Sequence, residues 1–272
     1  MNIFTNTMAD MNWVTIKDHA NRDAIVLLPM GVIEEHGPQL CTATDIYTAH
    51  IHCVNVADKL HEQGYDAVIA PPFYWGICQA NKGFIGSFSI RPETAQALLY
   101  DILCSLKEFG FSKVFAINAH GDVEHKLTAL RAFSEACEKL DMTACFPFEK
   151  ELLPHFGLTG QEPHIYLLAP QNIQVSYAAV GDVHAGDVET AMISAYYPGL
   201  VDHAMAESLP DVPLSLAKWE AWMFGGQIKQ LSSQGYLGSP SSYKTVDIEK
   251  NREDWACRIA EGIVARINKD YD

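Results

Sequence analysis

Short apolar runs alternate with helix-length segments along the first half of the chain, and this alternation limits the possible folds most strongly. Four runs have the length of buried strands and are rich in Val, Ile and Phe: residues 24–30, 67–71, 113–118 and 142–148. Between them, residues 44–64, 92–110 and 120–140 repeat apolar side chains at helical spacing. Strands and helices in this order predict an α/β fold, with a parallel sheet and helices on both of its faces.

The second half of the chain is less regular. Residues 149–179 and 198–242 are rich in Pro, Gly, Ser and Gln, which predicts long loops and short helices over one edge of the sheet. A last amphipathic helix is expected over residues 247–269, where Trp255 and Ile263 lie on its apolar face. The sequence shows no internal repeat and no linker, so we expect a single domain over residues 1–272.

The charge of the chain narrows the kinds of partner. A formal net charge of -15 argues against nucleic acid and anionic membranes, because both bind basic surfaces, and it favours a small-molecule substrate. The seven cysteines lack CxxC spacing and lie mostly in apolar runs, as reduced thiols do in cytosolic proteins. No apolar run has membrane-spanning length, and residues 1–12 lack the regions of a signal peptide. We therefore expect a cytoplasmic protein.

Ionisable side chains follow two of the predicted strands, at the edge of the sheet where ligands of such folds bind. Glu34, His36 and Asp45 come after the first strand, and His120 and Asp122 come after the third. Spacing of i, i+2 places each imidazole and its neighbouring carboxylate on one side of an extended segment. Two imidazoles and three carboxylates suit Zn²⁺ or Mn²⁺, and they suffice for two ions that share one bridging carboxylate.

Each of these residues has a simpler explanation when it is taken alone. Asp45 and Asp122 could cap helices, and His120 could be a hydrogen-bonded histidine of the core. The Glu-x-His pair could belong to a solvated loop. Their common position after strands of one predicted sheet favours the metal site.

A third segment, HAGDVET, places His184 and Glu189 near the start of a helix. Two cations that share one water lower the pKa of that water toward about 7, which yields a hydroxide able to attack a carbonyl. The leaving group then needs a proton, for which we expect His184 as the acid and Glu189 as its orienting partner. Cys78 is expected either to line the substrate pocket or to be a small buried hydrophobe.

Three segments together resemble the creatininase (creatinine amidohydrolase) family. LPMGVIEEHGPQLCTATD is similar to the first loop of that family, INAHGD to its Asn-Gly-His segment, and HAGDVET to its His-Ala-Gly-x-x-Glu-Thr segment. The resemblance implies a layered α/β fold with a mainly parallel central sheet, two divalent metal ions per chain (Zn or Mn, with Fe as a further option), and hydrolysis of small amides. It also implies a homo-oligomer, since several members of the family form hexamers.

The same resemblance implies a role for each candidate ligand. Glu34 and His120 match positions that hold one metal, His36 and Asp122 match positions that hold the other, and Asp45 matches the bridge. Creatininase has Glu at the position of Asp122, so Asp122 would contact the second metal through a shorter side chain.

The sequence departs from the family where the substrate is expected. The family has a Ser and then Glu-His before a Phe-Pro-Gly-Thr turn, whereas this chain reads GICQANKGFIGSFS, with Cys78 in place of the Ser. The aromatic-acid pair that precedes the His-Ala-Gly segment in creatininase is missing before His184. We therefore expect metal-dependent hydrolysis of a small cyclic amide, a formamide or a related carbonyl compound other than creatinine. The alternatives are hydrolytic ring opening of a lactone or a cyclitol-derived carbocyclic ketone, and a metal-binding homologue without turnover.

Overall fold

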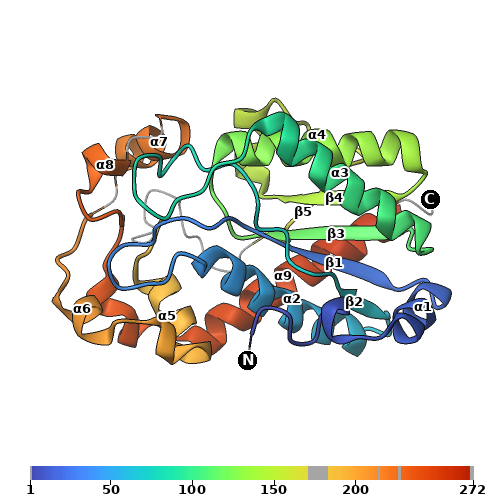
Figure 1. Cartoon of the computed structure of the whole chain (residues 1–272), viewed down its shortest axis with the longest axis horizontal. Coiled ribbons are helices and arrows are strands. Elements are labelled where there is room, and N and C mark those ends of the chain that lie inside the picture. Colours follow the sequence, from blue (N-terminus) through green and yellow to red (C-terminus); the bar gives the residue numbers. More distant parts are fainter. Residues whose placement is uncertain (1, 171–182, 214, 226–227, 270–272) are drawn as a thin grey trace.

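Five parallel strands form the centre of the molecule in the computed structural model, which describes residues 2–170, 183–213, 215–225 and 228–269 (Figure 1). The sheet has the spatial order β2-β1-β3-β4-β5, and its strands are β1 (Ile25–Met30), β2 (Ala67–Ile69), β3 (Lys113–Asn118), β4 (Thr143–Phe148) and β5 (Ile165–Leu167). β1 pairs with β3 along its whole length, from Ile25 opposite Lys113 to Met30 opposite Asn118. The two strands that precede the candidate ligands therefore end side by side.

Helices cover both faces of this sheet. α2 (Thr44–Glu62) and α9 (Ile248–Lys269) pack on one face, and α3 (Pro92–Glu108) and α4 (Val123–Leu140) pack on the other (Figure 1). Side chains of β1 alternate between the two: Val26 and Leu28 belong to the core under α3 and α4, whereas Ile25 and Leu27 belong to the core with α2 and α9. β1 is buried at every residue, which explains its unbroken apolar sequence.

The shorter elements lie around the two ends of the sheet. α1 (Trp13–Asn21) precedes β1, and the helices between β5 and α9 gather beyond the carboxyl ends of β1 and β3, at the left of Figure 1. These helices are α5 (Asp187–Tyr196), α6 (His203–Ser208), α7 (Leu216–Gly225) and α8 (Ile228–Leu231). Short 3-10 helices complete the described part of the chain: η1 (Met8–Asp10), η2 (Lys150–Phe156), η4 (Pro198–Leu200) and η5 (Pro240–Thr245).

The α/β fold with its parallel sheet and flanking helices is confirmed. α4 begins at Val123, later than the predicted start at residue 120, because Asp122 is its N-cap and the residues before it stay outside the helix. β5 was not predicted: its strand lies within the polar stretch 149–179, of which residues 171–179 fall outside the described part. Three residues are too few to show a period, and β5 forms because it pairs with β4.

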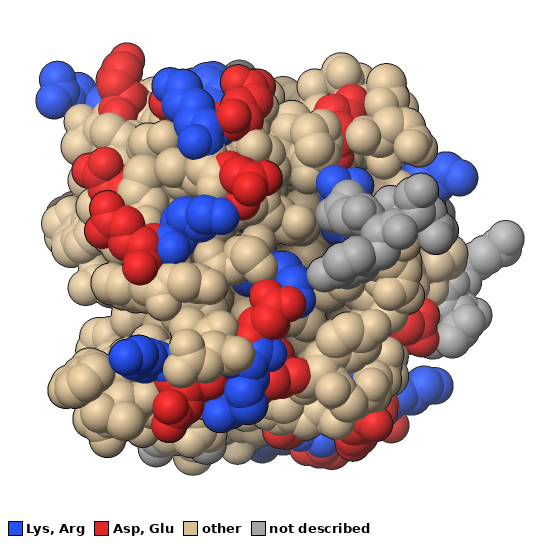
Figure 2. All heavy atoms as spheres, turned by 90° about the vertical axis from the view of Figure 1, so that its right-hand side faces the viewer, with Lys and Arg blue, Asp and Glu red and all other residues tan. Residues whose placement is uncertain are grey.

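The face at the right of Figure 1 carries charges of both signs. Figure 2 shows that acidic and basic side chains lie next to one another in small groups there, and that uncharged surface lies between the groups. The net negative charge of the chain is therefore not gathered into one patch on this face. Within the described residues, every helix is too short or too polar to cross a membrane.

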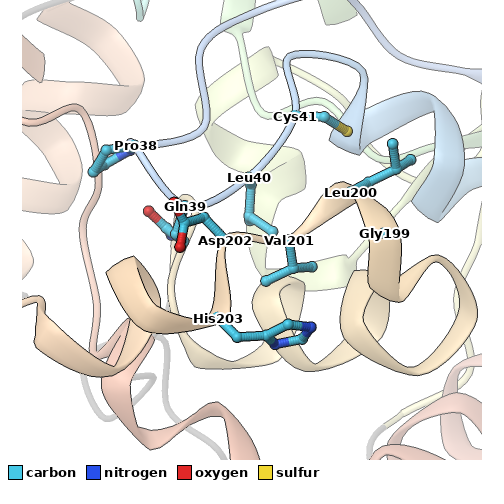
Figure 3. Close-up of a pocket in the computed structure, with 9 residues that line it drawn as sticks. All are labelled: Pro38, Gln39, Leu40, Cys41, Gly199, Leu200, Val201, Asp202 and His203. Carbon is cyan, nitrogen blue, oxygen red and sulfur yellow. The ribbon is translucent and has the colours of Figure 1, made fainter.

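A shallow surface pocket of about 540 Å³ lies where the loop after β1 meets the segment after α5 (Figure 3). Its walls are residues 38–41 and 199–203, which are joined by the Leu40 to Val201 bridge and by the N–H of Asp202 donating to the carbonyl of Gln39. The pocket contains none of the candidate site residues. The candidate residues Glu34 and His36 of the same loop are instead buried.

Candidate metal centre

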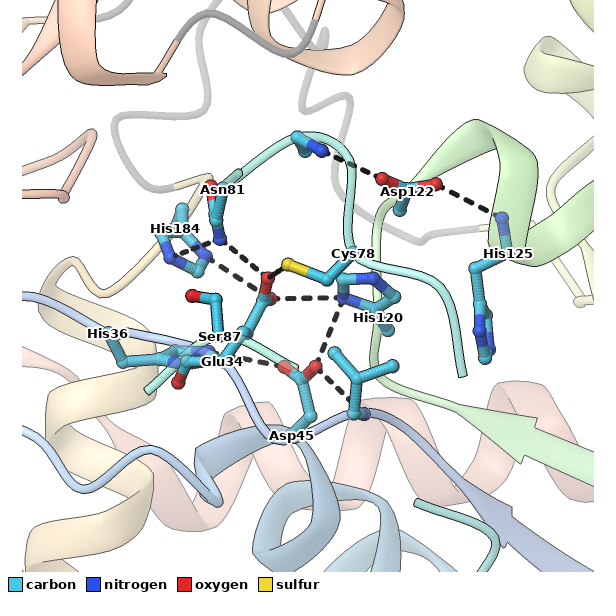
Figure 4. Close-up of polar contacts among 12 residues, drawn as sticks. Glu34, His36, Asp45, Cys78, Asn81, Ser87, His120, Asp122, His125 and His184 are labelled. Carbon is cyan, nitrogen blue, oxygen red and sulfur yellow. Dashed lines mark hydrogen bonds and ion pairs between the residues drawn. The ribbon is translucent and has the colours of Figure 1, made fainter. Parts of the chain in front are cut away.

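Candidate ligands from distant segments converge just beyond the carboxyl ends of β1 and β3 (Figure 4). Glu34 and His36 come from the loop after β1, Asp45 from the first turn of α2, and His120 from the loop after β3. The four residues are nearly inaccessible to solvent, with exposed fractions of 1%, 0%, 2% and 2% in that order. Ionisable groups buried this deeply are costly unless they are paired with an opposite charge or a metal.

Asp45 faces the cluster and does not cap its helix. The N-cap of α2 is Ala43, and Oδ2 of Asp45 accepts the N–H of Val32 at 3.3 Å. Gly31 permits this approach, because a Cβ atom at that position would lie only 2.6 Å from the Cβ of Asp45. The start of α2 therefore packs directly on the end of β1, and the simple explanation of Asp45 as a helix cap does not hold.

Each of the two imidazoles presents a bare nitrogen to the carboxylates. Nδ1 of His36 donates to the carbonyl of Glu34 at 3.2 Å, which leaves Nε2 facing Oδ1 of Asp45 at 3.1 Å. Nε2 of His120 donates to the carbonyl of Ile77 at 2.9 Å, which leaves Nδ1 at 3.0 Å from Oε1 of Glu34 and 3.1 Å from Oδ2 of Asp45. A backbone carbonyl that fixes the far nitrogen is the usual support of a metal-binding histidine.

The electrostatics of the cluster favour a cation between these groups. Burial opposes the charged form of His36, yet the Asp45 carboxylate raises its pKa well above the usual value. Burial likewise opposes charge on His120, and Glu34 and Asp45 raise its pKa well above the usual value. The pKa of Asp45 is lowered in turn, because His36 and His120 outweigh the effect of burial. A proton or a metal ion is therefore stabilised where lone pairs would otherwise face carboxylates.

Three overlapping groups of side chains have the spacing of metal ligands, with their donor atoms within 4.8 Å of one another. They are Glu34 with Asp45 and His120, His36 with Asp45 and Glu189, and Glu34 with His36 and His184. Asp45 belongs to the first two and offers a different oxygen to each histidine. The residues therefore fit a pair of divalent ions that share Asp45.

Asp122, the fifth predicted ligand, belongs to none of these three groups. Its Oδ1 accepts the N–H of His125 at 3.0 Å as the N-cap of α4. Its Oδ2 accepts the N–H groups of Gln79 and Ala80 at 2.6 and 2.8 Å. Both oxygens are engaged by backbone donors, so the simpler explanation of Asp122 as a helix cap applies, and its expected role as a metal ligand finds no support in this geometry.

His184 lies against the cluster, next to a carboxylate that the sequence did not suggest. Its Nε2 lies 2.9 Å from the carbonyl oxygen and 3.4 Å from Oε1 of Glu35, and its Nδ1 lies 4.0 Å from Oε1 of Glu34. Burial and His36 lower the pKa of His184, but Glu35 and Glu34 outweigh them, and the net pKa is raised. Glu189, the expected partner, accepts the N–H of Ala185 at 2.5 Å and faces His36 at 3.9 Å.

Cys78 and Asn81 lie behind Glu34, on the loop that departs from the family pattern. The Cys78 thiol is 1% exposed and donates to Oε2 of Glu34 at 2.9 Å. Burial and the Glu34 charge raise the pKa of this thiol, so it is protonated and not a nucleophile. The amide of Asn81 donates to the same Glu34 oxygen at 2.6 Å.

Sequence reasoning missed Glu35, Asn81 and Trp222 as parts of the site. Glu35 stands between two predicted ligands, so its position was a usable signal. Asn81 lies within a loop already marked as unusual, but nothing there indicates contact with Glu34 or His184. Trp222 donates from Nε1 to Oδ1 of Asn81 at 3.2 Å across 141 residues of sequence, which only the fold can bring together.

A buried cluster of imidazoles and carboxylates at the carboxyl edge of a parallel α/β sheet is an arrangement with which metal-dependent hydrolases hold their ions. Residues 9–263 match the family Creatininase, described as creatinine amidohydrolase. The chain belongs to the creatininase family.

Individual relatives agree with this assignment. A creatinine amidohydrolase of Pseudomonas putida is 24% identical over 185 residues, covering 66% of this chain and 67% of the relative. A mycofactocin precursor peptide peptidase of Mycolicibacterium smegmatis is 32% identical over 227 residues, covering 83% and 78%. A solved creatininase in a manganese form has the same fold, with a TM-score of 0.65 and 21% identity over 97% of this chain and 98% of that one. A Zn–Zn form of a creatininase variant has also been solved.

Proposed function

We propose that the chain hydrolyses a carbon–nitrogen bond in a small cyclic amide, a formamide or a related carbonyl compound, with two divalent ions shared by Asp45. The observation that carries the proposal is the pair of bare imidazole nitrogens, Nε2 of His36 and Nδ1 of His120, each 3.1 Å from its own oxygen of Asp45. Divalent ions in such a site supply Lewis acidity, which polarises a carbonyl and makes water a nucleophile at neutral pH.

The ligand set that we propose differs from the predicted one at a single residue. One ion would be held by Glu34, Asp45 and His120, and the other by His36, Asp45 and Glu189. Glu189 thus takes the place that the sequence suggested for Asp122, whose oxygens are engaged by backbone N–H groups.

His184 is the residue that we propose as the acid for the leaving group. Two acceptors of Glu35 face its Nε2, at 2.9 and 3.4 Å, and they favour a proton on that nitrogen, whereas the Asn81 amide nitrogen, 2.9 Å from the same atom, is a donor and opposes it. The imidazolium carries a proton on both nitrogens, and we propose that Nδ1, 4.0 Å from Oε1 of Glu34, gives up the proton because it faces the metal ligands. Glu35, not Glu189, holds the ring in this orientation.

A peptide bond is a second candidate substrate. The relative from M. smegmatis is named a peptidase and is 32% identical to this chain, a higher identity than the 24% of the creatinine amidohydrolase. Both reactions break an amide bond and need a proton at the departing nitrogen. The two candidates therefore share one metal centre and one acid, and they differ in the substrate that must reach it.

The proposal is tested by measuring the metal content of the protein and by screening a panel of substrates. Protein purified without chelator is expected to hold about two divalent ions per chain and to hydrolyse one of hydantoins, formamides or short peptides. Creatinine is expected to be a poor substrate, because the aromatic-acid pair before His184 is missing. Absence of bound metal, together with no uptake of added Zn²⁺ or Mn²⁺, would refute the proposal. Turnover of lactones or inososes alone would replace it with the ring-opening alternative.

A further inference from the structure

The segment Ile77–Asn81 passes over Glu34 and is tied to the start of α4 (Figure 4). Asp122 holds its middle, since Oδ2 accepts the N–H groups of both Gln79 and Ala80, at 2.6 and 2.8 Å. The other oxygen of Asp122 accepts the N–H of His125 at 3.0 Å. One buried carboxylate, 2% exposed, therefore joins the first turn of α4 to this segment.

Two histidines hold the first residue of the same segment. The carbonyl of Ile77 accepts from Nε2 of His120 at 2.9 Å, and its N–H donates to Nδ1 of His125 at 3.4 Å. The fit is tight, because a Cβ atom on Gly76 would lie 2.3 Å from Nδ1 of His125. The path of the segment is thus fixed at Ile77 as well as at Gln79 and Ala80.

The side chains of this segment act on one oxygen of Glu34. The Cys78 thiol and the Asn81 amide both donate to Oε2, at 2.9 and 2.6 Å. The orientation of the Asn81 amide is set by Trp222, whose Nε1 donates to Oδ1 of Asn81 at 3.2 Å. The remaining oxygen, Oε1, points to His120 at 3.0 Å.

We propose that Asp122 is a positioning residue that makes Glu34 a one-oxygen metal ligand. It acts through the backbone of Gln79 and Ala80, which places the Cys78 and Asn81 donors on Oε2 and leaves only Oε1 for the ion. The inference rests on the metal centre of the proposed function. It assigns Asp122 to the support of the site of Glu34, Asp45 and His120, not to direct ligation of the other ion.

The donors on Oε2 affect metal binding because a carboxylate can otherwise rotate. Without donors on Oε2, the Glu34 carboxylate could turn and offer either oxygen or both, and each geometry would bind an ion differently. Hydrogen bonds to an ionised group are stronger than neutral ones, so two of them on the same oxygen fix the rotation. Loss of such supporting contacts typically weakens metal binding by about 10- to 100-fold.

The experiment measures Zn²⁺ binding to the full chain by competition with a chromophoric chelator, and the visible absorption of the Co²⁺-loaded protein. Asp122→Ala is expected to bind two ions per chain still, with about 10- to 100-fold weaker affinity at one site and a changed Co²⁺ spectrum. Asp122→Asn should fall between this variant and the wild type, because its amide oxygen can still accept from Gln79 and Ala80. Glu124→Gln, in the same turn of α4, is the matched control and should bind as the wild type does.

Cys78 gives an independent route to the same conclusion. Cys78→Ser keeps a donor to Glu34 and should retain the affinity, whereas Cys78→Ala should lower it. Asp122→Ala combined with Cys78→Ala should weaken binding less than the product of the single effects, because both act on one oxygen.

Stoichiometric loss of one ion in Asp122→Ala would make Asp122 a direct ligand, and an unchanged affinity and spectrum would make it a helix cap only. Either result overturns this inference alone, whereas a wild type that binds no metal overturns the proposed function.

Discussion

Glu189 and His36 face each other across the cluster, with Oε2 of the carboxylate 3.9 Å from Nε2 of the imidazole. The same imidazole nitrogen lies 3.1 Å from Oδ1 of Asp45. The gap between Glu189 and His36 is too long for a hydrogen bond, but it suits two ligands on either side of one ion, each about 2 Å from it. In the proposed metal centre, Glu189 would complete the second site that His36 and Asp45 begin.

Glu189→Gln is expected to lower the metal content from about two ions to about one, because a neutral amide is a weaker ligand than a carboxylate. Elemental analysis after dialysis against metal-free buffer gives the measurement. Asp187→Asn, in the same first turn of α5, removes an equal charge and should leave the content unchanged. Full retention in Glu189→Gln would exclude Glu189 as a ligand of that ion.

Asp45→Ala is expected to lose both ions, since each of its oxygens faces a different histidine. Asp58→Ala removes an exposed carboxylate from the same helix and serves as the matched control. Metal content and thermal unfolding of both variants should be compared. If Asp45→Ala kept one ion at full affinity, Asp45 would be a ligand of the other site alone.

His184→Ala should keep the metals and the fold but lower kcat by roughly 10² to 10⁴, the usual contribution of a positioned acid. The KM value should change less. The pKa of His184 is raised, and the acid form is lost as pH rises through that pKa, so the alkaline limb of the activity profile should flatten in the variant. An unchanged kcat would exclude His184 as the acid.

Glu35→Gln tests separately whether Glu35 orients the His184 ring and whether its negative charge raises the pKa of that ring. The carbonyl of Glu35 remains in place at 2.9 Å from Nε2, and a Gln side chain can still accept a hydrogen bond. We therefore expect a smaller fall in kcat than in His184→Ala, together with an alkaline limb shifted to lower pH, because a carboxylate no longer stabilises the imidazolium. A limb that does not move would show that Glu35 leaves the titration of His184 unaffected.

Acid lability is expected from His52, which is buried on α2 beside Trp255, with ring centroids 5.8 Å apart. Burial lowers its pKa from 6.5 to about 4. The unfolded chain therefore binds more protons between these values, and the free energy of unfolding falls as pH drops through this window. The loss from this group is of the order of 3 kcal/mol.

His52→Leu should flatten the dependence of unfolding free energy on pH over that window, as measured by denaturant titrations at several pH values. The control is His155→Leu, which removes an exposed histidine from η2. A slope that is equal in His52→Leu and in the wild type would show that other groups account for the acid lability.

The repeating patterns of the sequence were sufficient for most of the fold and for part of the site. β1 and β3 are buried on both faces, so their apolar runs are unbroken and their carboxyl ends could be located. The predicted ends of these two strands place Glu34, His36, Asp45 and His120 close together, as they are in the structure.

The orientation of individual side chains could not be predicted from the sequence. Asp122 has the same i, i+2 relation to His120 as His36 has to Glu34, yet it turns to the N–H groups of Gln79 and Ala80 because α4 begins directly after it. Glu189 and His36 meet through contacts between α5 and the loop after β1, which no local period encodes. Local spacing places side chains on a segment, and tertiary packing decides what they meet.

The burial of the cluster has a consequence for the whole molecule. Glu34, His120 and Glu189 come from three separate parts of the chain, so bound ions would cross-link the loop after β1, the loop after β3 and α5. An ion that binds only the folded chain stabilises it by mass action, by about 4 kcal/mol at a free concentration of a thousand times Kd. Without the ion, protonated His36 and His120 must compensate the charges of Glu34 and Asp45. The melting temperature of this protein is therefore a property of the chain and the free metal concentration together.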